Sequence, residues 1–328
     1  MRHLVSVVIT TFNQAPYIRE AVEAALQQTY PSREVLVVDD GSTDETPAIL
    51  APYRGAITYV RQPNQGVAGA RNTGVRHARG ELVAFLDGDD LWDAEKLDVQ
   101  VAAADLEPRA GLIAVDGIEF RDDEVLRPSL LGEHVRARLA QGEPMVTLAC
   151  YADLLRSNLV ATTSQVMIPR RVLDAVGPSD ARWPLSSDWD LYLRIAARYL
   201  FTFVNRSLTQ WRQHDTSASG PADTRWLRWA MDDIEILKEQ LEAAPARYAA
   251  LVREELAVRL ARTIQTAYAH GRHRDRAWAV RYLARLLASN PTNGRALRHL
   301  IALCLPQRFV EGFRITTRGV AGRPSRSS

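Results

Sequence analysis

Three aspartates crowd one short segment of the chain, FLDGDDLWD at residues 85–93. Asp87, Asp89 and Asp90 lie within four positions, and carboxylates held this close repel one another unless a positive charge lies among them. Hard divalent cations such as Mg²⁺ prefer carboxylate oxygens and often complete their coordination with phosphate oxygens of a substrate. The segment therefore predicts a divalent cation that binds a phosphorylated ligand. The alternative is a solvated acidic loop.

Four short runs of β-branched and aliphatic residues each predict a β-strand, and the aspartates lie at the end of the last run. The runs are LVSVVIT (4–10), EVLVVDD (34–40), ITYVR (57–61) and LVAFLD (82–87). Helical patterns lie between them at residues 15–29, 43–51 and 67–77. Ser42 and Glu45 have the spacing of a capping box that starts the second helix. Apolar strands that alternate with helices predict the α/β class, with a mostly parallel central sheet between helices.

Residues able to contact a ligand follow all four predicted strands. They are Thr11, Phe12 and Asn13 after the first strand, Asp39 and Asp40 after the second, Asn64 after the third, and Asp87 to Asp90 after the fourth. In open parallel sheets, ligands bind outside the carboxyl ends of the strands. We therefore expect these residues to share one edge of the sheet and one ligand. For the segment DDGS taken alone, an ordinary turn is the alternative.

The remainder of the chain divides by pattern. The predicted elements are one or two strands at 111–120, an irregular loop at 125–145, a helix at 145–156, a strand at 162–169, an amphipathic helix at 188–199 and a strand at 201–205. Residues 224–304 hold almost no strand pattern and are rich in Ala, Leu, Arg and Glu. We therefore expect a sheet domain at 1–220, a helical extension at 221–318 and a disordered tail at 319–328.

Four segments together resemble the family 2 glycosyltransferases, which are inverting enzymes with the GT-A nucleotide-sugar-binding fold. The segments are SVVITTFNQAPYIREAVEAALQQTYPSREVLVVDDGSTDET (6–46), NQGVAGARNTGVRHARGELVAFLDGDD (64–90), SSDWDLYLRIA (186–196) and WRQHDTSAS (211–219). The resemblance implies transfer of a sugar from a nucleotide-sugar donor to a hydroxyl acceptor. The acceptor that it implies is a glycan or lipid-linked intermediate of a cell-surface polysaccharide or glycoconjugate.

The resemblance also assigns roles in donor binding. It places Thr11, Phe12 and Asn13 against the base and ribose, and it gives Asp40 a hydrogen bond to the base or ribose, with Asp39 as the alternative. Because an ionised carboxylate only accepts hydrogen bonds, it suits a uracil N–H or sugar hydroxyls, and we expect a UDP-linked donor. For Phe12 the alternative is an ordinary core aromatic.

The segment NQGVAGARNTG, which begins at Asn64, supplies small residues where a backbone must approach a ligand closely. It opens a predicted helix whose N-terminal amides are able to face a diphosphate. In the family this region binds the donor, so Arg71 and Asn72 join Asn64 as candidate residues. The alternative for Arg71 is a salt bridge within the sheet.

The Asp-x-Asp motif of the family is matched by Asp87 and Asp89. The resemblance implies that Asp89 binds Mg²⁺ or Mn²⁺ directly, and that Asp87 reaches the ribose, or the metal through water. Such a cation stabilises the charge that grows on the departing diphosphate oxygen. His214 would complete the metal site or touch the diphosphate, and Arg212 would neutralise phosphate charge. Asp90 is expected to cap a following helix.

An inverting transfer needs a base that takes the proton from the acceptor hydroxyl. The family carries this carboxylate in a Glu-Asp pair, and here the pair reads Ser187-Asp188, so Asp188 is the expected base. Residues two apart on a helix point about 200° apart, so Asp190 cannot face the same site. The alternative for Asp188 is a helix cap. Trp189 is expected to pack in the core.

Charge and composition limit the partners and the location. The 41 basic and 39 acidic residues nearly cancel, which excludes a nucleic-acid partner from our expectations. We find no signal-peptide pattern and no apolar stretch of spanning length, so we expect a cytoplasmic protein, free or at the inner face of the membrane. Around Leu297 and Ile301, a basic amphipathic segment predicts either a packed helix or a peripheral membrane contact.

Two other functions remain open at this point. A nucleotidyltransferase would share the α/β sheet and the metal-binding aspartates, but it would need a glycine-rich basic loop after the first strand, and TTFNQAPY has neither feature. A non-catalytic nucleotide-sugar-binding protein would bind the donor and remain indifferent to the loss of Asp188.

Overall fold

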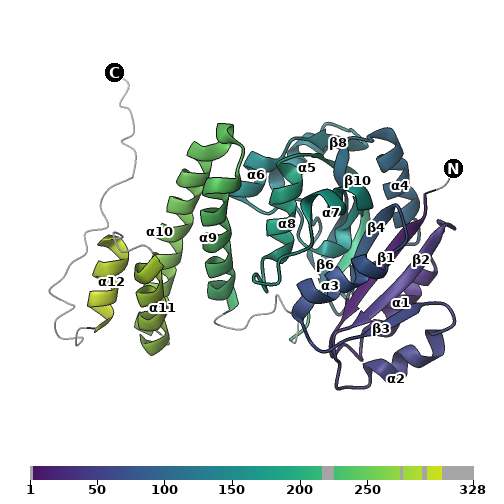
Figure 1. The fold of residues 1–328 in the computed structure, drawn as a ribbon, viewed down its shortest axis with the longest axis horizontal. Helices are drawn as coiled ribbons and strands as arrows, with labels where there is room; N and C mark the ends of the chain where they lie inside the picture. The colour runs from purple at the N-terminus through teal and green to yellow at the C-terminus, as the bar shows by residue number, and fades with distance from the viewer. Residues whose placement is uncertain (1–2, 216–224, 274–275, 290–293, 305–328) are drawn as a thin grey trace. The chain divides into compact units, whose positions relative to one another are not determined.

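The computed structural model describes residues 3–215, 225–273, 276–289 and 294–304 (Figure 1). Contacts divide the chain into two compact units, Met1–Leu256 and Ala257–Ser328, and each is described by itself. The first unit is built around one sheet. Its strands are β1 (Val5–Thr11), β2 (Arg33–Asp39), β3 (Thr58–Arg61), β4 (Leu82–Asp87), β5 (Leu91–Trp92), β6 (Ala110–Arg121), β7 (Glu124–Arg127), β8 (Met145–Leu148), β9 (Val166–Pro169) and β10 (Leu200–Arg212).

The order of the strands is β3-β2-β1-β4-β9-β6-β10-β5, with β7 paired to β6 and β8 paired to β10. The first four strands of this path run parallel, as do β6 and β10. Between these two groups, β9 lies antiparallel to both β4 and β6. The predicted α/β class with a mostly parallel central sheet is confirmed. The inserted antiparallel β9 is a feature that the sequence pattern did not indicate.

Helices cover both faces of this sheet. They are α1 (Ile18–Leu26), α2 (Thr46–Leu50), α3 (Gly66–His77), α4 (Lys96–Leu106), α5 (Glu133–Leu139), α6 (Tyr151–Arg156), α7 (Arg170–Val176) and α8 (Ser187–Ala196), with short 3₁₀ turns η1 (Ala51–Tyr53) and η2 (Thr163–Gln165). Side chains alternate along β1. Val7 and Ile9 pack in the cluster that holds α1 and α4, whereas Val8 joins the cluster that holds α8.

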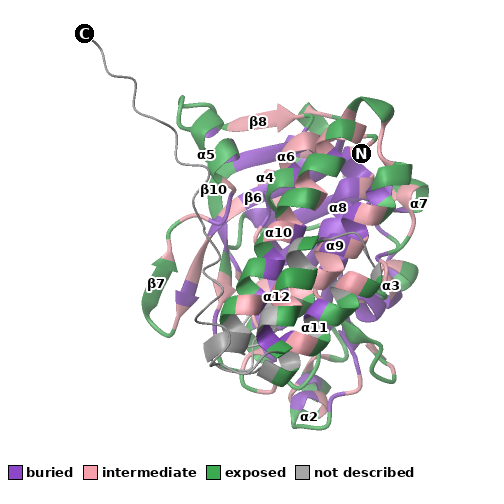
Figure 2. Cartoon of the chain, turned by 90° about the vertical axis from the view of Figure 1, so that its left-hand side faces the viewer, coloured by how far each residue is buried: buried purple, intermediate pink, exposed green. Residues whose placement is uncertain are grey.

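Burial follows these layers. Strand β6 and helix α8 are largely buried, β10 is buried over Phe201–Val204 and again at Leu208 and Thr209, and β7 is exposed (Figure 2). Helix α3 lies so close to β1 that a Cβ added at Gly74 would be 2.2 Å from Val8 Cγ1. Glycine at that position therefore lets the helix lie against the strand.

Three local predictions are wrong. The predicted helix at 145–156 divides into strand β8 and helix α6, because Met145–Leu148 pairs with the edge of β10. The predicted loop at 125–145 contains most of β7 and all of α5. The predicted capping box is absent: α2 begins after Glu45 with no side-chain cap, and Ser42 instead accepts a hydrogen bond from the Asn13 backbone.

Helices follow the sheet. They are α9 (Arg225–Ala243), α10 (Ala249–His273), α11 (Arg276–Ser289) and α12 (Gly294–Cys304), with a 3₁₀ turn η3 (Ala246–Tyr248). Helix α9 belongs to the first unit, where buried Tyr151 donates a hydrogen bond to Gln240 Oε1 at 2.6 Å. The second unit holds the rest of α10 with α11 and α12, and it buries Ala279, Leu283 and Leu303.

The predicted domain boundary at 220 and the predicted tail at 319–328 lie outside the described residues and stay predictions. Among the helices of the described residues, none combines the length and the apolar character needed to cross a membrane.

Candidate functional site

The register of the parallel strands brings the predicted ligand-binding residues to one edge. Thr11 at the end of β1 is the partner of Asp39 at the end of β2, and Thr10 is the partner of Asp87 at the end of β4. Asp39 is in turn the partner of Arg61 at the end of β3. The four strand ends therefore meet as expected from the sequence.

Thr11 at the end of β1 and the two residues that follow it lie at this edge. Phe12 is 45% exposed, so it is not a core aromatic. Asn13 adopts φ 52°, and its Oδ1 accepts a hydrogen bond from the Thr43 backbone at 2.7 Å, which ties this loop to the loop after β2. Thr11 is buried, and its hydroxyl has no hydrogen-bond partner among the described residues.

The two aspartates at the end of β2, Asp39 in the strand and Asp40 just after it, differ in how many of their oxygens accept hydrogen bonds. Asp39 is fully buried, and it accepts hydrogen bonds from the Tyr59 hydroxyl at 2.6 Å and the Ser42 backbone at 2.8 Å. Burial and the neighbouring Asp39 raise the pKa of Tyr59 to about 12. Asp40 uses only Oδ1, which accepts from Gln62 at 2.7 Å and from the Gln65 backbone. Within the described residues, Asp40 Oδ2 is therefore the available acceptor.

The loop after β3 lies close to these aspartates. Gly41 has φ +84°, and a Cβ there would lie 3.1 Å from the Asn64 backbone nitrogen, so glycine permits the two loops to approach. Asn64 Oδ1 accepts a hydrogen bond from the Gly66 backbone at 3.1 Å, at the start of α3. The side chain of Asn64 thus shapes the entry to the helix.

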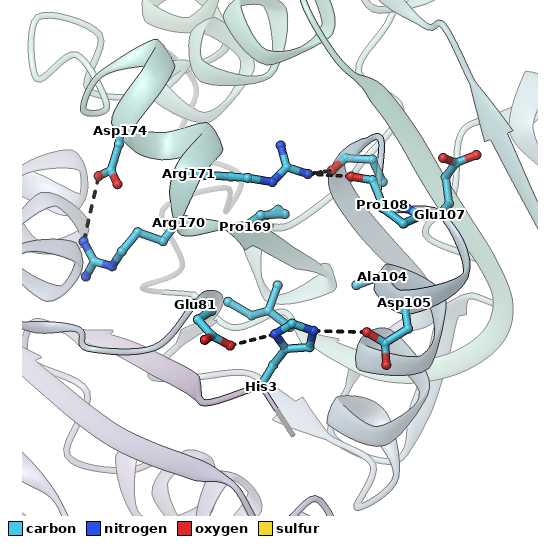
Figure 3. A pocket seen from close by; sticks show the side chains of 12 residues that line it. His3, Glu81, Ala104, Asp105, Glu107, Pro108, Pro169, Arg170, Arg171 and Asp174 are labelled. Carbon is cyan, nitrogen blue, oxygen red and sulfur yellow. Dashed lines mark hydrogen bonds and ion pairs between the residues drawn. The ribbon is translucent and has the colours of Figure 1, made fainter. Parts of the chain in front are cut away.

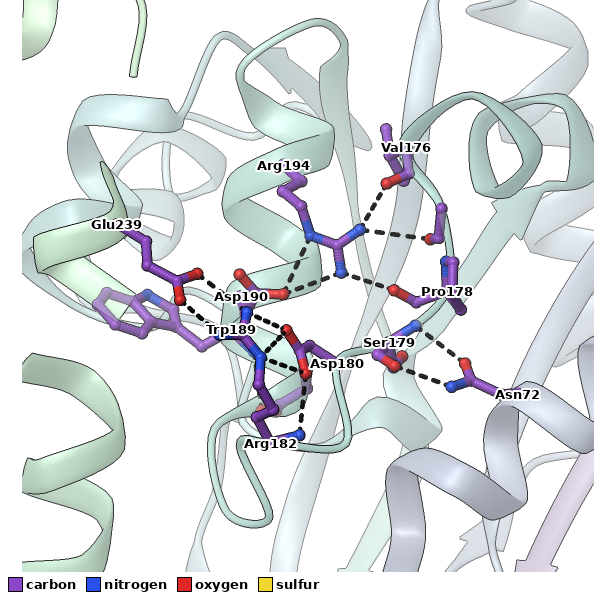
Figure 4. A network of polar contacts seen from close by, with 12 residues as sticks. Asn72, Val176, Pro178, Ser179, Asp180, Arg182, Trp189, Asp190, Arg194 and Glu239 are labelled. Carbon is purple, nitrogen blue, oxygen red and sulfur yellow. Dashed lines mark hydrogen bonds and ion pairs between the residues drawn. The ribbon is translucent and has the colours of Figure 1, made fainter. Parts of the chain in front are cut away.

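Arg71 and Asn72 on α3 point to different neighbours. Arg71 Nη2 donates to Asp87 Oδ1 at 2.8 Å and to Thr163 Oγ1 at 2.6 Å, and its buried Nε has no partner in the described part of the chain. Both polar groups of the Asn72 side chain bind the backbone of Ser179 (Figure 4). Of the two candidates, only Arg71 reaches the acidic turn.

Hydroxyl groups from residues 162–164 hold the acidic turn. Thr163 Oγ1 donates to Asp87 Oδ2 at 3.0 Å, and Ser164 Oγ donates to Asp90 Oδ2 at 2.6 Å. Thr162 Oγ1 adds a hydrogen bond to Asp90 Oδ2 at 3.1 Å. Sequence reasoning missed these residues and read them as part of a strand. A run of three hydroxyl residues before an apolar strand was the signal that could have found them.

Asp90 is a structural residue, and its predicted role as a helix cap is wrong. The chain continues from it into strand β5, and its side chain is fully buried. Its Oδ1 accepts a hydrogen bond from the Arg212 backbone at 3.0 Å. Burial, with Asp89 and Asp87 nearby, raises the pKa of this carboxyl well above its usual range.

Asp89 faces His214, which follows the end of β10. The distance between Asp89 Oδ2 and His214 Nε2 is 3.0 Å, and the imidazole stacks on Tyr17 with ring centroids 4.4 Å apart. Arg212 donates from Nε to the Asp89 carbonyl at 3.0 Å and pairs with Glu20 at 2.5 Å. The guanidinium of Arg212 therefore holds the backbone of the turn by a hydrogen bond, and its charge is already paired with the Glu20 carboxylate.

A divalent cation at this turn would find one carboxylate and one imidazole, those of Asp89 and His214, and would take the rest of its coordination from water and phosphate. Within the described residues, no three His, Cys, Asp or Glu side chains are gathered into a metal-binding group. Mg²⁺ is commonly held by one or two carboxylates together with phosphate oxygens of a substrate. The 3.0 Å between Asp89 Oδ2 and His214 Nε2 is the length of a hydrogen bond, so these two side chains contact each other directly. Asp87 is occupied by Arg71 and Thr163.

Asp188 lies in the first turn of α8. Ser186 is the N-cap of the helix, so Asp188 is not the cap. The Asp188 side chain is half-buried. The loss of water around its carboxyl raises the pKa of Asp188, and the positive charge of Arg71 opposes that rise. Asp188 thus lies within electrostatic reach of both Arg71 and Asp87.

The neighbours of Asp188 on the same helix behave as expected. Asp190 pairs with Arg194 at 2.9 Å (Figure 4). Trp189 is buried and donates from Nε1 to the Leu154 carbonyl at 2.9 Å, which confirms its predicted packing role. Tyr192, one turn beyond Asp188, is 1% exposed, and its hydroxyl has no hydrogen-bond partner among the described residues.

A separate cavity of about 510 Å³ lies near the opposite ends of the strands (Figure 3). His3, which precedes β1, bridges Glu81 at 2.6 Å and Asp105 at 3.1 Å in its wall. None of the candidate residues lines this cavity. It is therefore distinct from the candidate site.

Comparisons with known proteins place this geometry in a family. Residues 6–174, more than half of the chain, match the family model described as Glycosyl transferase family 2. An uncharacterized glycosyltransferase of Rickettsia typhi is 31% identical over 222 residues, which cover 67% of each chain. The Escherichia coli UDP-Glc:alpha-D-GlcNAc-diphosphoundecaprenol beta-1,3-glucosyltransferase WfgD is 36% identical over 102 residues, 30% of this chain and 40% of that one.

Solved structures share the fold at low identity. Staphylococcus aureus TarS 1–349, crystallised with UDP-GlcNAc, superimposes with a TM-score of 0.68 at 16% identity, covering 95% of this chain and 91% of that one. The mannosyltransferase PcManGT of Pyrobaculum calidifontis, in complex with GDP-Man and Mn²⁺, gives a TM-score of 0.55 at 20% identity over 93% of this chain and 86% of that one. With more than half of its residues matched to the family model and with this fold, the chain belongs to glycosyl transferase family 2.

Proposed function

We propose that the protein is a metal-dependent, inverting glycosyltransferase that moves a sugar from a UDP-linked donor to a hydroxyl of a glycan or lipid-linked acceptor. One observation carries the proposal. A partly exposed carboxylate, Asp188, lies within electrostatic reach of the Arg71–Asp87 pair, next to the turn that presents Asp89 to His214. A base and a phosphate-binding edge are thereby combined in one site.

The donor end of the site is formed by the loops after β1 and β2. Asp40 Oδ2 accepts a hydrogen bond from the uracil N–H or a ribose hydroxyl, and the exposed ring of Phe12 lies against the base. Support for a UDP-linked donor comes from the TarS complex with UDP-GlcNAc and from the name of WfgD. Both oxygens of the buried Asp39 carboxylate already accept a hydrogen bond, which favours Asp40 for this role.

The diphosphate is expected beside Arg71 and the acidic turn. Asp89 and His214 would hold Mg²⁺ or Mn²⁺ there, which the Mn²⁺-bound structure of PcManGT supports. Once bound, this cation supplies a positive charge that stabilises the departing diphosphate oxygen. The Arg71 guanidinium, which pairs with Asp87, adds a positive charge on the same side.

Asp188 performs the proton transfer. The acceptor oxygen attacks the anomeric carbon of the donor sugar, and the bond between that carbon and the diphosphate oxygen breaks. The proton of the acceptor hydroxyl moves to the Asp188 carboxylate. A single displacement of this kind inverts the anomeric centre. The raised pKa of Asp188 favours the role, because a general base is most effective when its pKa approaches the working pH.

The decisive experiment separates binding from turnover. Asp188→Asn should bind a UDP-sugar with Mn²⁺ as the natural protein does in calorimetry, while transfer falls by roughly 10²- to 10⁴-fold. Asp174→Asn, an exposed carboxylate on α7, is the matched control and should transfer normally. Full transfer activity of Asp188→Asn would contradict the assignment of Asp188 as the base and would favour a non-catalytic nucleotide-sugar-binding protein.

The metal residues have their own test. His214→Ala should raise the Mn²⁺ concentration needed for half-maximal activity, with acceptor affinity unchanged. Equal activity of the variant and the natural protein at every Mn²⁺ concentration would remove His214 from the site.

A peripheral membrane contact through the C-terminal helices stays part of the proposal, together with a location at the inner face of the membrane. It is supported by Leu297 and Ile301 on α12, which are 46% and 49% exposed. In liposome flotation with anionic lipid, deletion of residues 292–328 should abolish binding. Unchanged flotation after the deletion would leave the packed helix as the better interpretation.

A further inference from the structure

The segment between α7 and α8, residues 177–186, leads directly to Asp188 and is tied down by several elements (Figure 4). Asn72 of α3 binds the Ser179 backbone in both directions, at 2.8 and 2.9 Å. Arg194 of α8 donates to the carbonyls of Val176, Gly177 and Pro178. Both anchors act on the beginning of the segment.

The end of the segment is held by helix α9. Asp232 Oδ2 accepts a hydrogen bond from the Leu185 backbone at 3.1 Å, and the Trp229 indole donates to the Leu185 carbonyl. Asp233 Oδ1 accepts from the Ser186 hydroxyl at 2.8 Å. We call Trp229, Asp232 and Asp233 the α9 clamp. Because two of its members are carboxylates, its hydrogen bonds belong to the stronger, charge-assisted kind.

The clamp acts on the residue that starts α8. Ser186 is the N-cap of α8 and is 3% exposed. Its carbonyl oxygen accepts a hydrogen bond from the Asp190 backbone N–H at 3.0 Å. Asp188 follows two positions later. In the described part of the chain, Asp188 accepts a hydrogen bond from one other residue, the backbone of Trp189 at 2.8 Å. No side chain there bonds to the Asp188 carboxylate, so its position depends on where and at what angle the helix begins.

We propose that the α9 clamp positions Asp188 for the transfer step, through its hydrogen bonds to Leu185 and Ser186. This inference rests on the proposed role of Asp188 as the base. Trp229, Asp232 and Asp233 are positioning residues and do not themselves meet the substrate. Residues 225–243 fall within the helical extension predicted from the sequence, and the proposal gives them a role in the transfer step.

The test uses the Ser186–Asp233 pair. Ser186→Ala and Asp233→Ala should each lower kcat for transfer by about 10- to 100-fold, the loss expected from a displacement of a catalytic group by up to about 1 Å. The KM for the donor and its affinity in calorimetry should not change, because the residues that bind the donor lie on other elements. The double variant should be no worse than the poorer single variant, since both remove one interaction.

Two matched variants complete the design. Asp233→Asn keeps an oxygen that accepts from Ser186 and should retain most of kcat. Glu235→Ala removes a partly exposed carboxylate from the same helix, whose partner is Lys238, and should leave kcat unchanged. A loss of kcat that appears in Asp233→Ala, is absent from Glu235→Ala and is restored in Asp233→Asn would support the clamp.

Other results would overturn it. If kcat of Ser186→Ala and Asp233→Ala equals that of the natural protein, the clamp has no catalytic role. If the losses add and donor affinity falls with them, the contacts serve only the stability of the fold. These outcomes are distinct from failure of the proposed function, which would appear as full transfer by Asp188→Asn.

Discussion

Two tyrosines in the core offer a controlled test of how the buried hydroxyl groups of this protein are satisfied. Tyr151 and Tyr192 are each 1% exposed. The Tyr151 hydroxyl donates to Gln240 Oε1 at 2.6 Å, whereas the Tyr192 hydroxyl has no partner in the described part of the chain. Replacement by phenylalanine removes one oxygen from each and leaves the ring in place.

The two replacements should change stability in opposite directions. Tyr151→Phe loses a hydrogen bond and leaves the oxygen of Gln240, which is 5% exposed, without its partner, at a cost of about 1–3 kcal/mol. Tyr192→Phe removes a desolvated hydroxyl that gains nothing in return, and should stabilise the fold by a similar amount, about 1–3 kcal/mol. The variants should therefore differ by roughly 2–6 kcal/mol.

Differential scanning calorimetry of the protein without ligand measures this difference. For a unit of this size, 1 kcal/mol corresponds to a shift of about 2–4 °C in Tm, so the two variants should melt on the order of 10 °C apart. A fall in Tm for Tyr192→Phe as large as that for Tyr151→Phe would refute the reasoning. It would mean that the Tyr192 hydroxyl is hydrogen-bonded in solution.

Two further substitutions test the site. Because burial raises the pKa of Asp188, the folded state binds this proton more tightly than the unfolded state, and the contribution of Asp188 to stability is lost as pH rises through the folded pKa. Asp188→Asn should thus have a higher Tm than the natural protein near neutral pH, and this difference in Tm should disappear toward about pH 4. A difference in Tm that does not change with pH would contradict the raised pKa of Asp188. At Gly88, a Cβ would lie 3.1 Å from the Thr10 carbonyl oxygen and 3.0 Å from Ile18 Cδ1, so Gly88→Ala should lose about 1–3 kcal/mol of stability and weaken the proposed Mn²⁺-dependent binding of the donor. Gly55→Ala, where nothing lies within 4 Å, is its control, and equal behaviour of the two variants would argue against the crowded turn.

The strand ends were predictable because their signals are local. Apolar runs of strand length, each followed by residues such as Asp40 or Asp87, locate one edge of a parallel sheet without knowledge of the rest of the chain. The same holds for Trp189, whose place in an amphipathic helix predicts burial.

The supports of the site were not predictable, because they come from distant segments. Asp90 was expected to cap a helix, and nothing near it in the sequence reveals that Thr162 and Ser164 cover it or that the chain enters a strand paired with β10. Met145–Leu148 likewise becomes a strand only because the edge of β10 is available. In both places tertiary pairing overrides the local pattern.

The dependence of the acidic turn on distant partners has a consequence for synthesis of the chain. The hydrogen bonds that define the turn join Asp87 to Thr10, Asp90 to Ser164, and Asp90 to the Arg212 backbone, across 77, 74 and 122 positions. A truncated protein that stopped soon after Trp92 would keep every aspartate of the motif and lose most of what shapes it. Contacts this far apart form late, since the loops between them must first be closed. A nascent chain on the ribosome should therefore be unable to capture its nucleotide until β10 has emerged and paired.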